Sequence, residues 1–314
     1  MNQSAPPDSL SPSSSSSLIL DGRWLADLLK QQIQNRAEAI YSRIGRRPGL
    51  GVILVGDNPA SQSYVGMKER FAAACGLTTF DVRLPADATR EQLRDAILEY
   101  NRNPEVDGIL LQLPLPKHLN TEEMLDLIDP AKDADGLHPI SQGLLMRGQG
   151  TLKPCTPQGA LRLLDVALTR LSGKEISRYE DIPEHDLAGK TAVVIGRSIL
   201  VGKPLALLLQ QRNATVIMGH SKSPDLAGLC RSADYVFAAA GAAHLVKREW
   251  LKSTSIVIDV GTSRLDTGKL TGDVDFNQVN GHVAALTPVP GGVGPMTVAM
   301  LVLNTLTACE QRNQ

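Results

Sequence analysis

Short apolar runs alternate with longer segments of helical spacing along most of this 314-residue chain. The runs are rich in Val and Ile and occupy residues 51–55, 108–112, 191–195, 215–218, 235–237 and 255–259. Apolar residues at helical spacing occupy segments 24–42, 61–75, 90–101, 121–127 and 157–171. Strands that are apolar throughout, and are separated by helices, are typical of parallel sheets covered on both faces. The pattern therefore predicts an α/β fold.

The chain is long enough for two domains, each with its own core. We expect one domain over residues 18–154 and a second, a Rossmann-type dinucleotide-binding domain, over residues 155–294. Each is expected to have a largely parallel sheet with flanking helices. A last helix within residues 295–314 is expected to pack back on the first domain. Residues 172–187 are polar and predict a surface loop.

The first 17 residues are rich in Ser and Pro and contain no Lys or Arg. This composition predicts a disordered tail, and not a secretory signal or a mitochondrial transit peptide. The net charge of −1 suggests neither a nucleic-acid nor a membrane partner. No apolar run approaches the roughly 18–20 residues needed to span a bilayer.

The four cysteines are far apart in the sequence and form no CxxC pair. Neither a disulfide framework nor a zinc site is indicated, and no other metal site is predicted. Separate reduced thiols are typical of a cytoplasmic protein.

A glycine-bearing turn from Gly196 to Gly202 joins the predicted strand 191–195 to an apolar helix. Backbone N–H groups and the N-terminus of a helix can approach a pyrophosphate at such a turn. The spacing is not GxGxxG, because Ser198 stands where the middle glycine would be. By spacing alone, a glycine turn in an unrelated α/β protein is about as good an interpretation. The strand before the turn and the helix after it favour a dinucleotide site.

The next predicted strand is followed by Gly219, His220, Ser221 and Lys222, with no acidic residue. An NAD site usually has Asp or Glu near this place to bind the ribose 2′-hydroxyl, and a carboxylate would repel a 2′-phosphate. Hydroxyl, imidazole and ammonium groups would accept the phosphate, and Arg197 supplies a further cation. The sequence therefore favours NADP, although a solvated strand end also explains His220 or Lys222 taken singly.

Ser61, Tyr64 and Lys68 share one face of a predicted helix, with Tyr64 and Lys68 as i,i+4 neighbours. An aromatic ring beside an ammonium group can stack on a flat heterocycle and hold a proton donor next to it. A lysine with its free pKa of about 10.4 is a poor base, so catalysis requires desolvation or a nearby cation. Judged by this pattern alone, an ordinary surface pair is the better interpretation.

Three later segments change that balance. The strand 108–112 ends in Gln112, and functional groups in open α/β sheets gather at the carboxyl ends of strands. Residues 132–139 form a loop rich in carboxylates, for which a plain acidic turn is the alternative. Residues 288–297 are rich in Gly and Pro, which is typical of a rigid linker or of backbone pressed against a ligand.

Together and in this order, these segments resemble the methylenetetrahydrofolate dehydrogenase/cyclohydrolase family from Leu18 to about Leu306. Nine motifs carry the resemblance: YVxxK at 64–68, QLPLP at 112–116, KDxDGxHP at 132–139, PCTPxG at 154–159, GRSxxVGxP at 196–204, HSK at 220–222, VIDVG at 257–261, GDVDF at 272–276 and PVPGGVGPMT at 288–297. One such motif is modest evidence, whereas nine in order are highly specific.

The resemblance implies NADP-dependent oxidation of methylenetetrahydrofolate and hydrolysis of the methenyl product to 10-formyltetrahydrofolate. It implies that Lys68 is the acid/base group of hydrolysis and that Gln112 positions it. Tyr64 would stack on the folate, and Asp135 would bind its pterin end. These four are the expected catalytic residues.

The same resemblance implies the remaining site residues. Residues expected at the cofactor are Gly196, Arg197, Ser198, Gly202, His220, Ser221 and Thr262, with Arg197 and Ser221 on the 2′-phosphate. Residues expected at the substrate, besides Tyr64, Gln112 and Asp135, are Ser61, Leu113, Pro114, Pro290, Gly291 and Gly292. A homodimer formed through the nucleotide domain, and a role in one-carbon metabolism and purine biosynthesis, are also implied.

Family members that only dehydrogenate depart at the position of Lys68, so the lysine here argues for both activities. A monofunctional dehydrogenase is the main alternative. An NADP dehydrogenase for another small substrate and a non-catalytic dinucleotide-binding protein are the others. The chain departs from the usual family pattern at Ala134, Leu137, Ser141, Gly219 and Ala240. None of these departures removes a proposed catalytic group.

Overall fold

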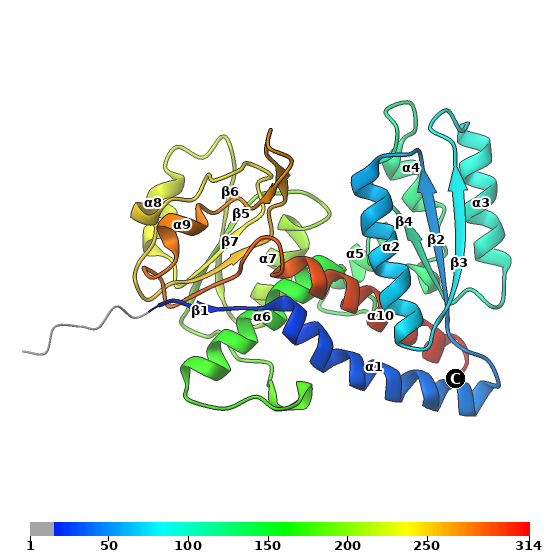
Figure 1. Cartoon of the computed structure of the whole chain (residues 1–314), viewed down its shortest axis with the longest axis horizontal. Coiled ribbons are helices and arrows are strands. Elements are labelled where there is room, and N and C mark those ends of the chain that lie inside the picture. The colour runs from blue at the N-terminus through cyan, green and yellow to red at the C-terminus, as the bar shows by residue number, and fades with distance from the viewer. Residues whose placement is uncertain (1–15) are drawn as a thin grey trace, which may run out of the picture.

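The computed structural model describes residues 16–314, which form two α/β lobes side by side (Figure 1). The predicted tail lies outside the described residues apart from its last two positions. At Ser17 the prediction is wrong, because this residue is buried and its hydroxyl accepts a hydrogen bond of 2.9 Å from the Gly281 N–H. The ordered fold therefore begins no later than Ser17.

The first lobe has a three-stranded parallel sheet in the order β3-β2-β4. Its strands are β2 (Gly49–Val55), β3 (Thr78–Leu84) and β4 (Gly108–Leu111). Its helices are α2 (Pro59–Ala74), α3 (Arg90–Arg102), α4 (Thr121–Asp126) and α5 (Pro139–Met146), with a short 3-10 turn, η1 (Pro130–Lys132). The strand β3 was not predicted, because as an edge strand it is only partly buried and lacks a continuous apolar run.

The second lobe has a six-stranded parallel sheet in the order β1-β11-β8-β7-β5-β6. Its strands are β1 (Leu18–Ile19), β5 (Thr191–Ile195), β6 (Thr215–Gly219), β7 (Tyr235–Ala238), β8 (Ile256–Asp259) and β11 (Ala285–Leu286). Its helices are α7 (Gly202–Gln211), α8 (Leu226–Ser232) and α9 (Phe276–Val279), and its short 3-10 turns are η2 (Tyr179–Asp181) and η3 (Arg248–Trp250). It also has a small hairpin of β9 (Ser263–Arg264) and β10 (Leu270–Thr271). The predicted α/β class with largely parallel sheets is confirmed.

The first strand of the described residues, β1, belongs to the second lobe and not to the first. Leu18 pairs with Ala285 of β11, so β1 belongs to the larger sheet, although residue 18 was expected to open the first domain. Two residues are too few to show a strand pattern in the sequence. The next element, α1 (Gly22–Ile44), then leads from one lobe to the other (Figure 1).

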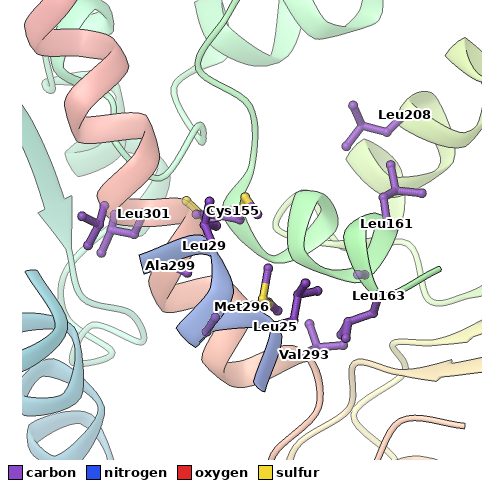
Figure 2. Packing of buried hydrophobic residues seen from close by; sticks show 14 of the residues in the cluster. Leu25, Leu29, Cys155, Leu161, Leu163, Leu208, Val293, Met296, Ala299 and Leu301 are labelled. Carbon is purple, nitrogen blue, oxygen red and sulfur yellow. The ribbon is translucent and has the colours of Figure 1, made fainter. Parts of the chain in front are cut away.

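Three helices form a layer that connects the lobes. They are α1, α6 (Cys155–Leu171) and α10 (Val293–Arg312), and α10 contacts both of the others as well as β2, β4 and α2. Figure 2 shows their buried side chains, among them Leu25, Leu29, Leu163, Met296 and Ala299. One continuous apolar cluster thus extends from the first sheet to the second.

Among the described residues, only α10 is long and apolar enough to cross a membrane by length and composition. The expectation that no segment approaches this length is therefore wrong. The most apolar 18-residue window of α10 is 72% buried inside the protein. This burial is that of a core helix packed against α1 and α6.

The loop at residues 172–187 was predicted to lie on the surface, but it is partly packed. Ile182 and Leu187 are buried, and Arg162 of α6 donates a hydrogen bond of 2.8 Å to the Tyr179 hydroxyl. The polar side chains of the loop face solvent, while Ile182, Leu187 and Tyr179 pack or bond against the rest of the protein.

Asp107 joins the beginning of the first sheet to the end of the chain. Its buried carboxylate accepts two hydrogen bonds from Arg46, at 2.7 and 2.8 Å, and one of 2.9 Å from the Gly49 N–H. Arg312, near the end of α10, donates to the same carboxylate at 3.2 Å. Charge-assisted hydrogen bonds of this kind are among the strong ones in proteins.

We predict that Asp107→Ala lowers the free energy of unfolding by roughly 2–4 kcal/mol, because it leaves the Gly49 N–H and two guanidinium groups without their acceptor. Urea denaturation of both proteins would measure the loss. Asp95→Ala is the control: Asp95 is exposed and paired with its neighbour Arg94, so we expect a change below about 0.5 kcal/mol. Equal effects of the two substitutions would contradict this role of Asp107.

Candidate active site

The carboxyl ends of the strands in the larger sheet lie in register. Ile195 of β5 lies opposite Gly219 of β6 and Ala238 of β7, and Ala238 lies opposite Asp259 of β8. The segments that leave these strand ends therefore start from one edge of the sheet. Ligands of open α/β sheets bind at this edge, beside the point where the strand order reverses.

A cavity of about 500 Å³ lies between this edge and the first lobe. It is lined from the first lobe by α2, including Tyr64, and from the second by Val260–Thr262 after β8. The segment 288–295 and the start of α1 close it. Of the predicted site residues, Tyr64, Thr262, Pro290, Gly291 and Gly292 line this cavity.

A larger cavity, of about 670 Å³, lies between the helical layer, α7 and the loop 172–187. It is lined by none of the predicted site residues, all of which lie in the described part of the chain. Its arginines Arg162 and Arg212 both bind the buried Asp165, at 2.9 and 2.7 Å. We therefore place the chemistry in the smaller cavity, where both lobes contribute.

The helix α2 begins directly after β2 because local residues define its start. The Asn58 side chain accepts hydrogen bonds from the N–H groups of Ala60 and Ser61, and Pro59 occupies the first turn. The helix buries Ser61 and Lys68 on its inner face and turns Tyr64 toward the cavity. Of the face predicted from the sequence, only Tyr64 lines the cavity, where Met67 and Phe71 accompany it, while Ser61 and Lys68 lie buried behind it.

Lys68 is a buried charged residue on the inner face of α2. Only 5% of it is exposed, and its Nζ donates a hydrogen bond of 3.0 Å to Gln112 Oε1, at the end of β4. The Nζ also lies 5.0 Å from the centre of the Tyr64 ring. Burial lowers the pKa of Lys68, while the negative charge of Asp135 opposes this shift. The desolvation that a catalytic lysine requires is therefore present.

The side chain of Gln112 is held by the backbone of the next residue. Its Nε2 donates to the Leu113 carbonyl at 2.5 Å, which leaves Oε1 directed at Lys68. Leu113 is half-buried and Pro114 is exposed, and both directly follow Gln112 after β4. Neither lines the described cavity.

Tyr64 keeps its proton at neutral pH. Burial raises its pKa to about 12, and its hydroxyl donates a hydrogen bond of 3.4 Å to the Gly294 carbonyl. Because Gly294 lies in the first turn of α10, this bond joins α2 to the helical layer beside the cavity. The ring is then left to contact a ligand.

The loop at residues 132–139 contains two acidic groups with different surroundings. Asp133 is buried and accepts hydrogen bonds from the N–H groups of Leu137 and His138, at 3.1 and 2.8 Å. Lys132 is also buried, and its Nζ donates to the carbonyls of Tyr100 and Asn103. These residues shape the loop. Asp135 is half-buried and does not line the cavity, but its charge acts on both Lys68 and Tyr64, so of the two acids it is the one near the α2 residues.

The glycine-bearing turn is closed by Ser198, whose Oγ accepts hydrogen bonds from the N–H groups of Val201 and Gly202, at 3.1 and 3.4 Å. Val201 lines the cavity. The Gly196 N–H donates to the Gly219 carbonyl at 2.8 Å, which brings the turn beside residues 219–222.

Polar groups suited to a phosphate surround that meeting point. Arg197 and Ser221 are exposed, and the His220 Nδ1 accepts the Lys222 N–H at 3.2 Å. No carboxylate belongs to residues 219–222. The donor set and the absence of a competing acid fit a dinucleotide with a 2′-phosphate.

Several cavity residues were not predicted. The hydroxyls of Thr156 and Thr297 lie 3.0 Å apart, and both residues line the cavity, as do Arg23, Asp27 and Asp259. The two threonines lie within motifs that were recognised, but only the packing of α6 against α10 brings them together. The helical spacing of residues in α1 does not indicate that Arg23 and Asp27 line a cavity.

Within residues 16–314, no group of His, Cys, Asp and Glu could hold a metal ion. All four cysteines lie in this range, are buried and are not disulfide-bonded.

Comparison with known proteins gives consistent matches over both lobes. The family model "Tetrahydrofolate dehydrogenase/cyclohydrolase, catalytic domain" matches residues 20–135, and that of the "NAD(P)-binding domain" of the same family matches residues 180–313. A protein of Oleidesulfovibrio alaskensis named "Bifunctional protein FolD" is 46% identical over 299 residues, covering 94% of this chain and 99% of that protein.

Two solved structures are similar over nearly the whole chain. The bifunctional enzyme FolD of Campylobacter jejuni has a TM-score of 0.85 and 41% identity, covering 94% of this chain and 99% of that one. The enzyme of Trypanosoma brucei, complexed with NADP cofactor and inhibitor, has a TM-score of 0.86 and 38% identity, covering 96% and 99%.

The buried amine predicts a pH-dependent stability. Because the pKa of Lys68 is lowered in the folded protein, the unfolded chain binds more protons between that pKa and about 10.5, and stability rises with pH in this window. We predict that Lys68→Met removes this rise, whose slope is at most about 1.4 kcal/mol per pH unit. Urea denaturation at pH 7 to 10 would measure it.

Lys117→Met is the matched control, because Lys117 is exposed shortly after the same strand end. This variant should follow the wild type at every pH. If the free energy of unfolding changed with pH in the same way for Lys68→Met and the wild type, the Lys68 amine would have an ordinary pKa in the folded protein.

Proposed function

The chain belongs to the tetrahydrofolate dehydrogenase/cyclohydrolase family, and on this premise we propose that one cleft carries out both of its reactions. The first is the NADP-dependent oxidation of methylenetetrahydrofolate to methenyltetrahydrofolate. The second is hydrolysis of the methenyl compound to 10-formyltetrahydrofolate, as part of one-carbon metabolism. The observation that carries the proposal is the buried Lys68, bound to Gln112 and facing the Tyr64 ring at the edge of the cavity.

The folate is proposed to bind along the first lobe. Its flat pteridine would stack on Tyr64, whose ring borders the cavity. Asp135 would accept hydrogen bonds from the amine donors of the pterin end. Further contacts are proposed for Ser61, Leu113, Pro114, Pro290, Gly291 and Gly292.

NADP is proposed to bind along the second lobe, and when bound it accepts the hydride from the methylene carbon. Gly196, Ser198 and Gly202 would present the turn to its pyrophosphate. Arg197, His220 and Ser221 would hold the 2′-phosphate. Thr262, which lines the shared cavity, would contact the part of the cofactor nearest the folate.

The hydrolytic step is proposed to use Lys68 in both protonation states. The methenyl group is a cation, so a neutral amine beside it is favoured over an ammonium. Neutral Lys68 would take a proton from water as the water oxygen bonds to the methenyl carbon. The bond from that carbon to the ring nitrogen would then break as the new hydroxyl releases its remaining proton to solvent and becomes the formyl carbonyl. Lys68 would return the first proton to the ring nitrogen. Gln112 would orient Nζ throughout by their 3.0 Å hydrogen bond.

Further properties follow as proposals. Residues 22–154 with 295–314 would form the folate domain, and residues 155–294, with β1 (Leu18–Ile19) paired to their sheet, the NADP domain. A homodimer would form through the NADP domain, where β6 is the edge strand of the sheet and Met218 is 36% exposed. The buried, unpaired thiols agree with a cytoplasmic location, and the formyl product suits purine biosynthesis.

We predict that Lys68→Met lowers methenyltetrahydrofolate hydrolysis at least about 100-fold, because it removes the general acid/base. Absorbance would be followed with methylenetetrahydrofolate plus NADP, and separately with methenyltetrahydrofolate alone. Lys117→Met should retain both rates. Hydrolysis that survives intact in Lys68→Met would remove this lysine from the mechanism, and failure of both wild-type reactions would refute the folate assignment.

We also predict that Arg197→Ala raises the KM for NADP by about 10- to 100-fold, because it removes a charge-assisted contact to the 2′-phosphate. The KM for NAD, which lacks this phosphate, should change little. Arg248→Ala, at an exposed arginine of the same lobe, is the control and should leave both constants unchanged. Equal changes for NADP and NAD would place Arg197 away from the phosphate.

A further inference from the structure

Two buried aspartates, Asp259 and Asp273, lie behind the cofactor edge of the larger sheet. Asp259 ends β8, and Asp273 lies in the segment between β10 and α9. They are only 3% and 0% exposed, and neither forms an ion pair with any residue of the described range 16–314. Buried carboxylates without cations require other partners.

Asp273 binds three consecutive backbone N–H groups. Its Oδ2 accepts from Ala240 at 2.6 Å and from Gly241 at 2.9 Å, and its Oδ1 accepts from Ala242 at 2.8 Å. Three donors from one loop leave that loop little freedom to move. The conformation of residues 240–242 is therefore set by a single carboxylate.

This loop follows β7, next to the glycine-bearing turn. The Ala239 N–H donates to the Ile195 carbonyl, at the end of β5, at 2.8 Å. The strands β6 and β7 lie on opposite sides of β5, so the strand order reverses at this place. Loops at such a reversal border the ligand crevice.

Asp259 holds the neighbouring loop and also Asp273 itself. Its Oδ1 accepts from the N–H groups of Gly261 and Asp273, both at 3.0 Å, and its Oδ2 accepts from Val274 at 2.9 Å. Val260, Gly261 and Thr262 line the cavity. One hydrogen-bonded chain thus runs from the cavity wall after β8, through both aspartates, to the loop after β7.

Two glycines make room for these carboxylates. A Cβ on Gly261 would lie 2.2 Å from the Asp273 carboxylate, and a Cβ on Gly272 would lie 1.9 Å from Asp259 Oδ2. Neither distance is possible between real atoms. Burial, together with the nearby Asp273, raises the pKa of Asp259 to about 7, although three backbone N–H groups oppose the shift.

We propose that Asp259 and Asp273 are positioning residues for the dinucleotide: they hold the loops 239–242 and 260–262 in the shape that receives it. They act through backbone, and Asp273 does not line the cavity. The proposal rests on the NADP site proposed above. It assigns to the VIDVG and GDVDF motifs a common role that neither strand pattern nor spacing revealed.

The test uses Asp273→Asn and Gly272→Ala in the full chain. An asparagine has one acceptor oxygen, so its amide group would face an N–H donor of the loop. The alanine would displace the Asp259 carboxylate from a position that does not itself line the cavity, because Gly272 is not a lining residue. Binding of NADP is measured by isothermal titration calorimetry, and methenyltetrahydrofolate hydrolysis is assayed without cofactor. We expect the Kd for NADP to rise at least tenfold in both variants, with hydrolysis within about twofold of wild type.

Asp165→Asn is the matched control, because Asp165 is equally buried but binds Arg162 of α6 and Arg212, which directly follows α7. It should lower the melting temperature and leave the Kd for NADP within twofold. The proposal is overturned if Asp273→Asn and Gly272→Ala bind NADP as tightly as wild type. It is also overturned if Asp165→Asn weakens binding equally. A wild-type protein that binds no NADP would instead refute the proposed function.

Discussion

The close packing of α6 against α10 is the constraint on which the cleft depends. A Cβ on Gly159 of α6 would lie only 2.8 Å from the Met296 Cβ, so the helices meet at a distance that only glycine permits. The hydroxyls of Thr156 and Thr297 bond at the same crossing. Because α10 continues directly from the segment that closes the cavity, this contact fixes the position of that segment between the lobes.

A rigid cleft also explains how Lys68 can remain buried. Removing an amine from water is unfavourable, and one hydrogen bond to Gln112 compensates only in part. The apolar cluster shared by both lobes supplies the remaining stability. The packing of the helical layer thus holds Lys68 in an environment that lowers its pKa. Proteins commonly accept such a loss of stability at a functional site.

Much of this arrangement could be predicted from the sequence, for reasons that are local. Continuous apolar runs indicated most of the long buried strands, and the i,i+4 spacing placed Tyr64 beside Lys68. Residues brought together by tertiary packing could not be predicted from pattern: the Lys68–Gln112 bond joins positions 44 residues apart. Edge strand β3 and two-residue β1 escaped detection because neither buries a continuous apolar run.

The surroundings of Lys68 suit the order of the two reactions. In the proposed mechanism, oxidation would create a cation next to this lysine, and an ammonium group there would repel the product as it forms. A lysine with a lowered pKa would avoid this repulsion and would then be in the state proposed to activate water. Asp135 limits the shift, so that the amine can still take up a proton and return it. A single desolvated lysine can therefore serve hydrolysis without hindering the oxidation that precedes it.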